Sequence, residues 1–276
     1  MKKSQLILVA VGIIAIVVLF SLPKVVVDND ATSAKIEDSG EPSDTPSDII
    51  SQSHENELSS QNRTQADQLI RNFLNAPTKE EKVTAAQILA GIYKEEGLFD
   101  SAAYYWEQAA VILPDNMFLA EEAGKASYEA FSFALDKNKV EALAEKTRNY
   151  LNKVLEKDPK RLDLKTKVAM TFVSSANPMQ GITMLREVLE EDPQNEDGLF
   201  NMGVLSMQSG QYKRAADRFE ELVKYHPQNI QGQFYLAVSY FEANEKNKAK
   251  AQFEEVKKLT QDPMILSSVQ SYLERL

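Results

Sequence analysis

The sequence contains no cysteine and only 2 histidines among 276 residues. The missing thiols exclude disulfide scaffolds, zinc–thiolate sites, iron–sulfur clusters and cysteine nucleophiles. Basic residues are outnumbered as well, because 31 Lys and Arg stand against 41 Asp and Glu. The net charge of −10 argues against nucleic acid as a partner, since phosphate binding needs a basic face. What the chain does have is a 43% hydrophobic share, enough for a substantial core.

Sequence motifs of catalysis are also missing. The chain has no glycine-rich phosphate loop, no HExxH and no GxSxG. His54 and His226 lie far apart, and neither has a recognisable catalytic partner in the sequence. Neighbouring carboxylates point about 100° apart on a helix, so we expect these pairs on solvated faces: Glu121-Glu122, Glu190-Glu191 and Glu220-Glu221. We therefore expect a protein that is not an enzyme and that binds no metal and no cofactor.

An apolar run occupies residues 6–22, directly after the short charged start at residues 1–5. At about 1.5 Å per residue, the run spans about 26 Å as a helix, near the short end for a bilayer core. This pattern predicts a single transmembrane anchor. A cleaved signal peptide is the alternative, but its apolar stretch is typically shorter and ends in a small-x-small site, which is absent after Leu22.

The charges that flank this run predict its orientation. Lys2 and Lys3 precede it, whereas Asp28 and Asp30 follow it. The positive-inside rule then places the N-terminus in the cytoplasm and the bulk of the chain in the periplasm or outside the cell. We expect a single-pass protein of the inner or plasma membrane.

Residues 28–63 have a different composition, rich in Ser, Pro and acidic residues and without aromatic residues. Such a segment cannot bury enough apolar surface to offset its ordering entropy, so we expect a disordered acidic linker. As a flexible coil it would reach roughly 30–36 Å root-mean-square. A plain spacer is the simpler interpretation, and a docking motif is the alternative.

From residue 64 onward the chain shows internal repetition. Four prolines, Pro114, Pro159, Pro193 and Pro227, each follow an apolar helical segment, and the last two are 34 residues apart. Proline ends one helix, and an asparagine two residues later is a good cap for the next; this asparagine is Asn116, Asn195 or Asn229. Between the prolines lies a turn whose first residue suits a left-handed backbone conformation: Gly97, Gly210 or Asn244.

These residues resemble the tetratricopeptide repeat, a helix–turn–helix unit of about 34 residues. The repeat at 196–229 fits best, through Leu199, Met202, Gly203, Gly210, Tyr212, Ala215, Phe219 and Pro227. Further repeats fall at 83–116, 162–195 and 230–263, the second of them weaker because Gly181 replaces a usual alanine. The resemblance implies an all-α, right-handed helical solenoid over residues 64–276.

The second repeat, 117–161, is longer than the others by 11 residues, close to three helical turns. We expect a lengthened helical hairpin with its tip at residues 136–138. The tip is either a partner site or a packing element. Apolar spacing also predicts capping helices at both ends of the solenoid, at 64–75 and at 264–276.

In proteins of this repeat family, the first helix of each repeat lines a concave groove. The groove positions carried over from the family are Phe200, Asn201, Val204, Met207 and Gln208 in one repeat, and Phe234, Tyr235, Val238, Phe241 and Glu242 in the next. Methionine and aromatic side chains suit a helical or unfolded peptide segment. The alternative is that these side chains pack between repeats.

The layout of anchor, linker and repeats is similar to that of bacterial periplasmic repeat proteins associated with the Sec translocon and envelope chaperones. It implies a membrane-anchored interaction module, an adaptor or scaffold of a cell-envelope complex whose partner is a protein or peptide. A periplasmic holdase-type chaperone and an assembly factor for one dedicated envelope substrate are the alternatives. Self-association through apolar solenoid surfaces is a further hypothesis.

Overall fold

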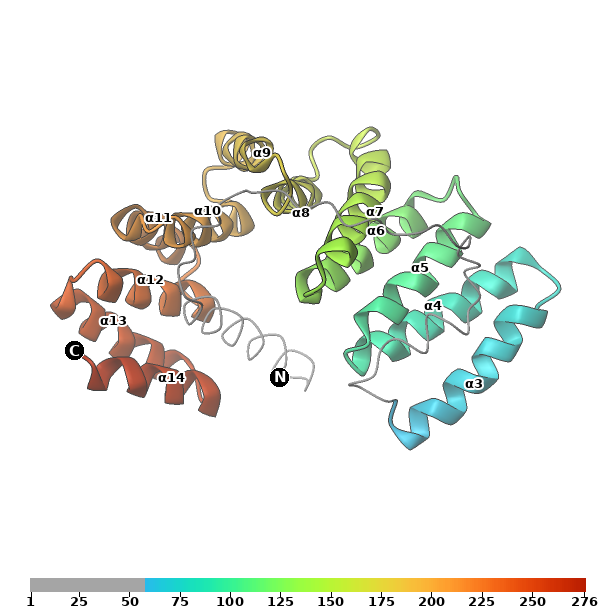
Figure 1. The fold of residues 1–276 in the computed structure, drawn as a ribbon, viewed down its shortest axis with the longest axis horizontal. Helices are drawn as coiled ribbons and strands as arrows, with labels where there is room; N and C mark the ends of the chain where they lie inside the picture. The colour runs from blue at the N-terminus through green and yellow to red at the C-terminus, as the bar shows by residue number, and fades with distance from the viewer. Residues whose placement is uncertain (1–57) are drawn as a thin grey trace, which may run out of the picture. The chain divides into compact units, whose positions relative to one another are not determined.

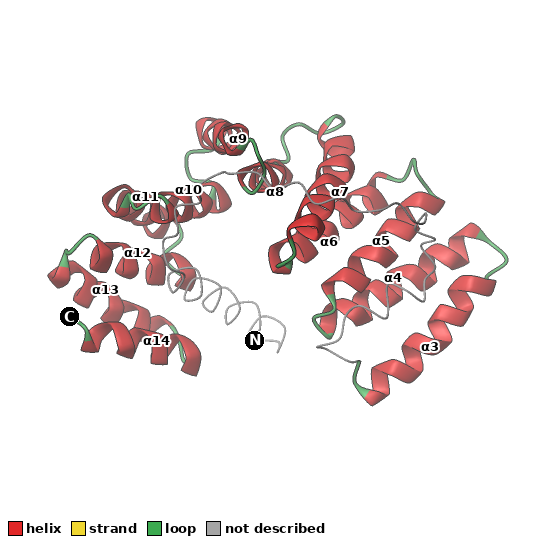
Figure 2. Ribbon diagram, in the orientation of Figure 1, coloured by secondary structure: helices red, strands yellow, loops and turns green. Residues whose placement is uncertain are grey.

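The computed structural model describes residues 58–276, and Figures 1 and 2 show that every regular element among them is an α-helix. This confirms the all-α fold class for that part of the chain. The predicted anchor at 6–22 and nearly all of the predicted linker lie outside the described residues. None of the helices between residues 58 and 276 is both long and apolar enough to cross a membrane.

The chain divides into two compact units, with the boundary after Tyr105, inside α5 (Phe99–Ile112). The described part of the first unit contains α3 (Ser60–Asn75), α4 (Lys79–Glu95) and the start of α5. The rings of Tyr93 and Tyr105 stack at 5.5 Å between centroids, and Phe73 of α3 meets Tyr105 edge-on at 5.9 Å. The predicted N-terminal helix is therefore joined to the first repeat by aromatic contacts.

Helix α3 begins at Ser60, so the helical region starts earlier than the predicted residue 64. The Ser59 side chain accepts a hydrogen bond from the Asn62 backbone N–H, and both side chains donate to the Glu96 carboxylate. This local cap satisfies backbone donors at the helix start and holds it there. The predicted linker therefore ends before residue 60.

The second unit contains consecutive helical hairpins that each pack on the next. They are α6 (Met117–Phe133) with α7 (Lys137–Leu155), α8 (Leu162–Val173) with α9 (Pro178–Glu191), α10 (Glu196–Gln208) with α11 (Tyr212–Tyr225), and α12 (Ile230–Glu242) with α13 (Lys246–Leu259), followed by α14 (Pro263–Glu274). The first helix of each hairpin begins at the first residue predicted for that repeat. Figure 1 shows these hairpins following one another along the unit.

The repeated asparagines cap helices as predicted. The side-chain oxygens of Asn116, Asn195 and Asn229 accept hydrogen bonds from the backbone N–H three residues later, at 3.2, 2.9 and 2.6 Å. The turn prediction is also confirmed, because Gly97, Gly210 and Asn244 have backbone φ of 78°, 71° and 62°. The starts of the repeats at 117, 196 and 230 are therefore set by local chemistry, whereas α8 starts at 162 without a side-chain cap.

Glycine allows close helix packing inside two of the hairpins. A Cβ atom on Gly203 would lie 2.6 Å from the ring of Phe219, which is fully buried. A Cβ atom on Gly181 would lie 2.3 Å from the backbone carbonyl oxygen of Ala169. The departure at Gly181 thus has a physical reason, since α8 and α9 approach too closely there for alanine.

The lengthened hairpin α6–α7 is present, but its tip lies slightly earlier than predicted. Residues 134–136 connect the two helices, because the Asp136 carboxylate accepts a hydrogen bond from the Lys139 backbone N–H at 2.9 Å and caps α7. Lys137 and Asn138 therefore already belong to the helix. Leu135, at the tip, is 99% exposed.

A charged clamp joins this hairpin to the next one. The Arg161 guanidinium donates two hydrogen bonds to the Glu121 carboxylate, at 2.7 and 2.9 Å, and two to Asp163, both at 2.9 Å. Lys125 forms a further ion pair with Glu121. The prediction that Glu121 lies on a solvated face was wrong, because its side chain is only 16% exposed beneath this arginine.

Candidate functional site

The residues predicted to line a peptide groove lie on α10 and α12, the first helices of two successive hairpins. These two helices contact each other directly. Asn195 and Asn229 cap their N-termini and fix where each helix begins. At about 100° per residue, positions 200, 204 and 207 of α10 fall on one side of the helix, and 234, 238 and 241 do so on α12. The local sequence therefore gathers the predicted residues into one region.

Burial divides the predicted residues into two groups. Met207, Phe234 and Val238 are buried, with 4–8% of their surface exposed. Phe200, Asn201, Val204, Tyr235 and Phe241 are half-buried, Glu242 is also half-buried, and Gln208 is exposed. The first group packs between helices, and the second group keeps surface that a partner can reach. A peptide-binding role for either group stays a prediction.

Helix α14 packs against Phe234 of the buried group and Phe241 of the half-buried group. The ring of Tyr272 meets Phe234 edge-on at 6.1 Å and Phe241 edge-on at 5.2 Å, and it stacks on Phe253 at 5.1 Å. The Arg275 guanidinium lies 4.9 Å from the centre of the Phe241 ring. The C-terminal helix thus covers one end of the predicted groove.

The half-buried group forms an aromatic surface with one polar contact point. The Phe200 and Tyr235 rings meet edge-on at 5.5 Å, and Tyr235 stacks on the buried Phe219 at 5.7 Å. The Asn201 side-chain N–H donates to the Asp197 carbonyl at 2.8 Å. The Asn201 carbonyl oxygen receives no hydrogen bond within residues 58–276, so it can accept one from a partner.

The ionisation of these tyrosines is suppressed. Burial, assisted by the nearby Tyr272, raises the pKa of Tyr235 to about 12. Burial also raises the pKa of Tyr272, with Glu242 in the same direction and Arg275 against it. Both phenols are therefore neutral near pH 7. The surface offers apolar contact, aromatic edges and a hydrogen-bond acceptor.

His226 makes contacts between two neighbouring hairpins. Its Nε2 lies 2.7 Å from the Gln194 carbonyl oxygen, and its Nδ1 lies 3.6 Å from the Glu196 carboxylate. These contacts join the end of α11 to the start of α10. Among residues 58–276, no group of three or more acidic or histidine side chains is arranged to hold a metal ion.

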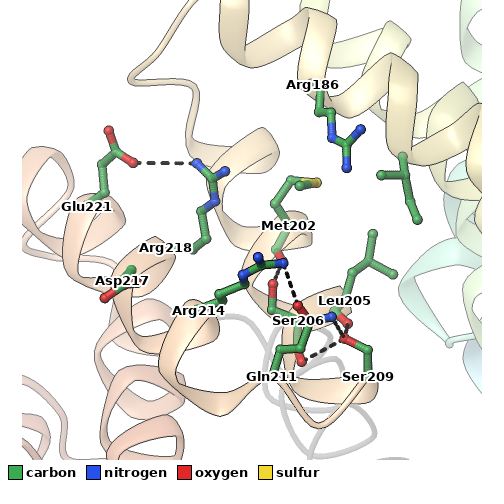
Figure 3. Close-up of a pocket in the computed structure, with 11 residues that line it drawn as sticks. Arg186, Met202, Leu205, Ser206, Ser209, Gln211, Arg214, Asp217, Arg218 and Glu221 are labelled. Atoms are coloured by element: carbon green, nitrogen blue, oxygen red, sulfur yellow. Dashed lines mark hydrogen bonds and ion pairs between the residues drawn. The ribbon is translucent and has the colours of Figure 1, made fainter.

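A pocket that the sequence analysis missed lies between α9, α10 and α11 (Figure 3), with a volume of about 360 Å³. Arg186 of α9 and Arg214 and Arg218 of α11 stand on its walls. The remaining lining residues are Ile182, Met202, Leu205, Ser206, Ser209, Gln211, Asp217 and Glu221. The spacing of Arg214 and Arg218 places them on one face of α11, but nothing in the sequence shows that Arg186 lines the same pocket.

Comparison with known proteins supports the repeat assignment. The tetratricopeptide repeat family model matches residues 206–270. A tetratricopeptide repeat protein from Parabacteroides merdae ATCC 43184 superposes with a TM-score of 0.57 at 16% identity, over 77% of this chain and 79% of that one. The comparison with curated proteins finds no match.

Two further solved structures share the helical-repeat likeness at lower similarity. The MamA protein has a TM-score of 0.46 at 14% identity, over 65% of this chain and 92% of MamA. YrrB, described as a tetratricopeptide-repeat protein with an unusual peptide-binding site, has a TM-score of 0.44 at 14% identity, over 75% and 99%. The family match at residues 206–270 and the repeated helical hairpins support a tetratricopeptide-repeat fold, which is the fold of a protein–protein interaction module.

Proposed function

We propose that this tetratricopeptide-repeat protein is a non-enzymatic, membrane-anchored interaction module that binds a helical or unfolded peptide segment along α10 and α12. It would serve as an adaptor or scaffold of a cell-envelope complex. The observation that carries the proposal is the half-buried surface of Phe200, Asn201, Val204 and Tyr235, set on a repeat fold.

The chemistry of this surface favours an amphipathic or unfolded segment. Aromatic rings held edge-on by their neighbours offer apolar area at little entropic cost, because their rotamers are already fixed. The neutral Tyr235 and the free carbonyl oxygen of Asn201 allow apolar side chains and a backbone N–H to dock together. A highly charged partner would lose its hydration there without gaining an opposite charge.

Site-specific crosslinking tests the binding surface. A photo-crosslinking amino acid at Val204 should capture a protein in cells, whereas the same group at Lys213, exposed on α11, should capture little. Capture of one defined protein supports an adaptor or a dedicated assembly factor. Capture of many unfolded clients supports the holdase alternative. Equal capture at Val204 and Lys213 would reject the surface.

The membrane part of the proposal depends on the apolar run at 6–22 and the charges around it. A reporter that is active only outside the cytoplasm, fused after Leu276, tests it. Activity supports an anchored protein whose repeats face the periplasm or the cell exterior. An inactive but expressed fusion would place the repeats in the cytoplasm and remove the cell-envelope role, while leaving the binding surface to be judged by crosslinking.

A further inference from the structure

The pocket between α9, α10 and α11 lies on a different side of α10 from the proposed peptide surface. At about 100° per residue, Met202, Leu205 and Ser206 fall opposite Phe200 and Val204 on this helix. The other walls come from α9 and α11, the second helices of their hairpins. Any ligand of the pocket would therefore be independent of a segment bound along α10 and α12.

The pocket concentrates positive charge in a chain whose net charge is −10. Within residues 58–276, no hydrogen bond or ion pair engages the Arg186 guanidinium. Arg214 donates only to a neutral group, the Gln211 side-chain oxygen, at 2.7 Å. Arg218 is 3.8 Å from the Glu221 carboxylate, a distance too long for a hydrogen bond. Two guanidinium groups thus lack an anionic partner, and the third is weakly paired.

The Arg214 side chain on the pocket wall is held in position by hydrogen bonds. Gln211 accepts from Arg214 and in turn donates to the Ser209 hydroxyl at 2.8 Å, and that hydroxyl donates to the Leu205 carbonyl at 3.0 Å. Figure 3 shows this relay below the Arg214 guanidinium, with Arg186 descending from the α9 side. An oriented guanidinium binds a carboxylate at lower entropic cost than a free one.

The other lining residues restrict the class of anion. Asp217 and Glu221 stand on the α11 wall, so a polyphosphate or nucleic acid would meet repulsion there. Ile182, Met202 and Leu205 supply apolar area beside the arginines. The three arginines outnumber the two acidic residues by one, so the lining favours a ligand with a single carboxylate. The apolar residues favour an aliphatic side chain next to that carboxylate. A volume of about 360 Å³ holds a few residues of peptide and no more.

We propose that the pocket formed by Arg186, Arg214 and Arg218 is a second binding site, which takes a short acidic peptide segment of a partner protein. A carboxylate of that segment lies between Arg186 and Arg214, and the adjacent aliphatic side chain contacts Met202 and Leu205.

Fluorescence anisotropy with the full-length protein tests this site. The probe is a fluorescein-labelled peptide, Gly-Ser-Gly-Leu-Glu-Leu, with a free C-terminus, and its matched control has Gln for Glu and a C-terminal amide. We expect the acidic peptide to bind at least about tenfold more tightly than the control. Equal affinity, or no binding of the acidic peptide, would overturn the proposal.

Two variants that each remove one positive charge show whether the acidic peptide binds in the pocket or is attracted by surface charge in general. Arg186→Gln should weaken binding of the acidic peptide about tenfold. Lys213→Gln, which changes an exposed side chain elsewhere on α11, should change it less than about twofold. Similar effects of the two variants would refute the site. If thermal unfolding shows that Arg186→Gln is destabilised, Arg214→Gln replaces it with the same expectation.

Competition identifies the source of the carboxylate. Unlabelled acidic hexapeptide should displace the probe, whereas inorganic phosphate and a peptide of residues 28–57 should displace it only weakly. If the peptide of residues 28–57 displaced the probe more strongly than the acidic hexapeptide, the assignment to a partner would be overturned. The pocket would then bind this chain's own acidic segment. Stronger displacement by phosphate would overturn the assignment to a peptide.

Discussion

Two junctions between neighbouring hairpins of the second unit are held together by different chemistry. The junction from α6–α7 to α8 has the Arg161 clamp to Glu121, and the Arg148 guanidinium lies 4.9 Å from the centre of the Phe172 ring. The junction from α10–α11 to α12 has instead three mutually contacting rings, those of Phe200, Phe219 and Tyr235. The helical frame is the same, but charge supplements the first junction and aromatic contact dominates the second.

The two junctions differ because one buries aliphatic side chains and the other buries aromatic rings. Beside the clamp, the core is aliphatic, made of Ala120, Leu151, Val154, Leu164 and Val168. Aliphatic contacts are not directional, whereas a guanidinium that forks between two carboxylates specifies one geometry. Ring contacts are directional by themselves, so the second junction needs no ion pair at its centre. The long hairpin therefore packs on α8 through an aliphatic core, with Tyr150 and Phe172 only at its edge, and the clamp adds a directional contact.

The largest expected effect is at the aromatic junction. Phe219→Ala removes a fully buried ring and leaves a cavity against Gly203, so we expect a loss of about 3–5 kcal/mol of unfolding free energy. Urea unfolding followed by circular dichroism measures it. Phe118→Ala, at a residue that is 57% exposed, is the control and should cost less than about 1 kcal/mol. Equal losses would contradict the dominance of ring packing.

A smaller effect is expected at the charged junction. Arg161→Gln removes four charge-assisted hydrogen bonds, but the site is partly solvated, so we expect a loss of about 1–2 kcal/mol. The loss should shrink in high salt, unlike that of Phe219→Ala, because ions screen exposed charge but not ring packing. Urea unfolding at low and high salt distinguishes the two junctions, and a salt-independent loss would count against the clamp.

The clamp also predicts a dependence on pH. Hydrogen bonds from Arg161, with further help from Lys125 and against the opposing effect of burial, lower the pKa of Glu121 from 4.5 to about 2. The folded state therefore gains stability from this carboxylate above about pH 4.5, and loses it as the pH falls toward 2. Acid unfolding curves should show a smaller loss between these values for Arg161→Gln than for the unchanged protein. If both proteins lost the same unfolding free energy between pH 4.5 and 2, the acid-sensitive stabilisation would come from a carboxylate other than Glu121.

The next effect concerns two buried hydroxyls of the long hairpin. The Ser127 hydroxyl is buried and has no hydrogen-bond partner among the described residues, whereas the Thr147 hydroxyl donates to the Leu143 carbonyl at 2.8 Å. Ser127→Ala should leave stability unchanged or raise it by up to about 1 kcal/mol, since an unpaired buried hydroxyl is costly. Thr147→Val should lower it by about 1 kcal/mol. Thermal unfolding compares them, and a destabilised Ser127→Ala would reveal a partner for that hydroxyl.

The smallest expected effect is at the hairpin tip. Leu135→Ser changes a side chain that is 99% exposed, so stability should shift by less than about 0.5 kcal/mol. Pull-down with the unchanged and the substituted protein then asks whether the tip binds a partner. Reduced capture at unchanged stability supports a partner site, and unchanged capture supports the alternative that the long hairpin is only a packing element.

The starts of the repeats at 117, 196 and 230 could be predicted because their signals are local, whereas α4 begins at Lys79, four residues before the predicted 83, because Thr78 caps it. A capping asparagine such as Asn195 and a left-handed residue such as Gly210 act within a few residues of their own position. The tip was misplaced by two residues for a related reason, since Asp136 can act as a loop residue or as a helix cap. Sequence spacing alone does not distinguish these roles.

The candidate surfaces were less predictable because burial depends on distant residues. The sequence could not show that Tyr272 would cover Phe234 and Phe241, since these residues lie more than thirty positions apart. Nor could it show that Arg161 would bury Glu121, or that Arg186 would face Arg214 across a pocket. Each case joins helices from different hairpins, and the alignment of repeats says nothing about such pairs.

The position of Tyr272 has a consequence for the order of synthesis. This ring completes the packing around Phe234, Phe241 and Phe253, yet it emerges from the ribosome after all three. At about 5–20 residues per second, the interval between Phe253 and Tyr272 is on the order of one to several seconds. Until Tyr272 is made, these three phenylalanine rings lack the one aromatic partner that all of them share.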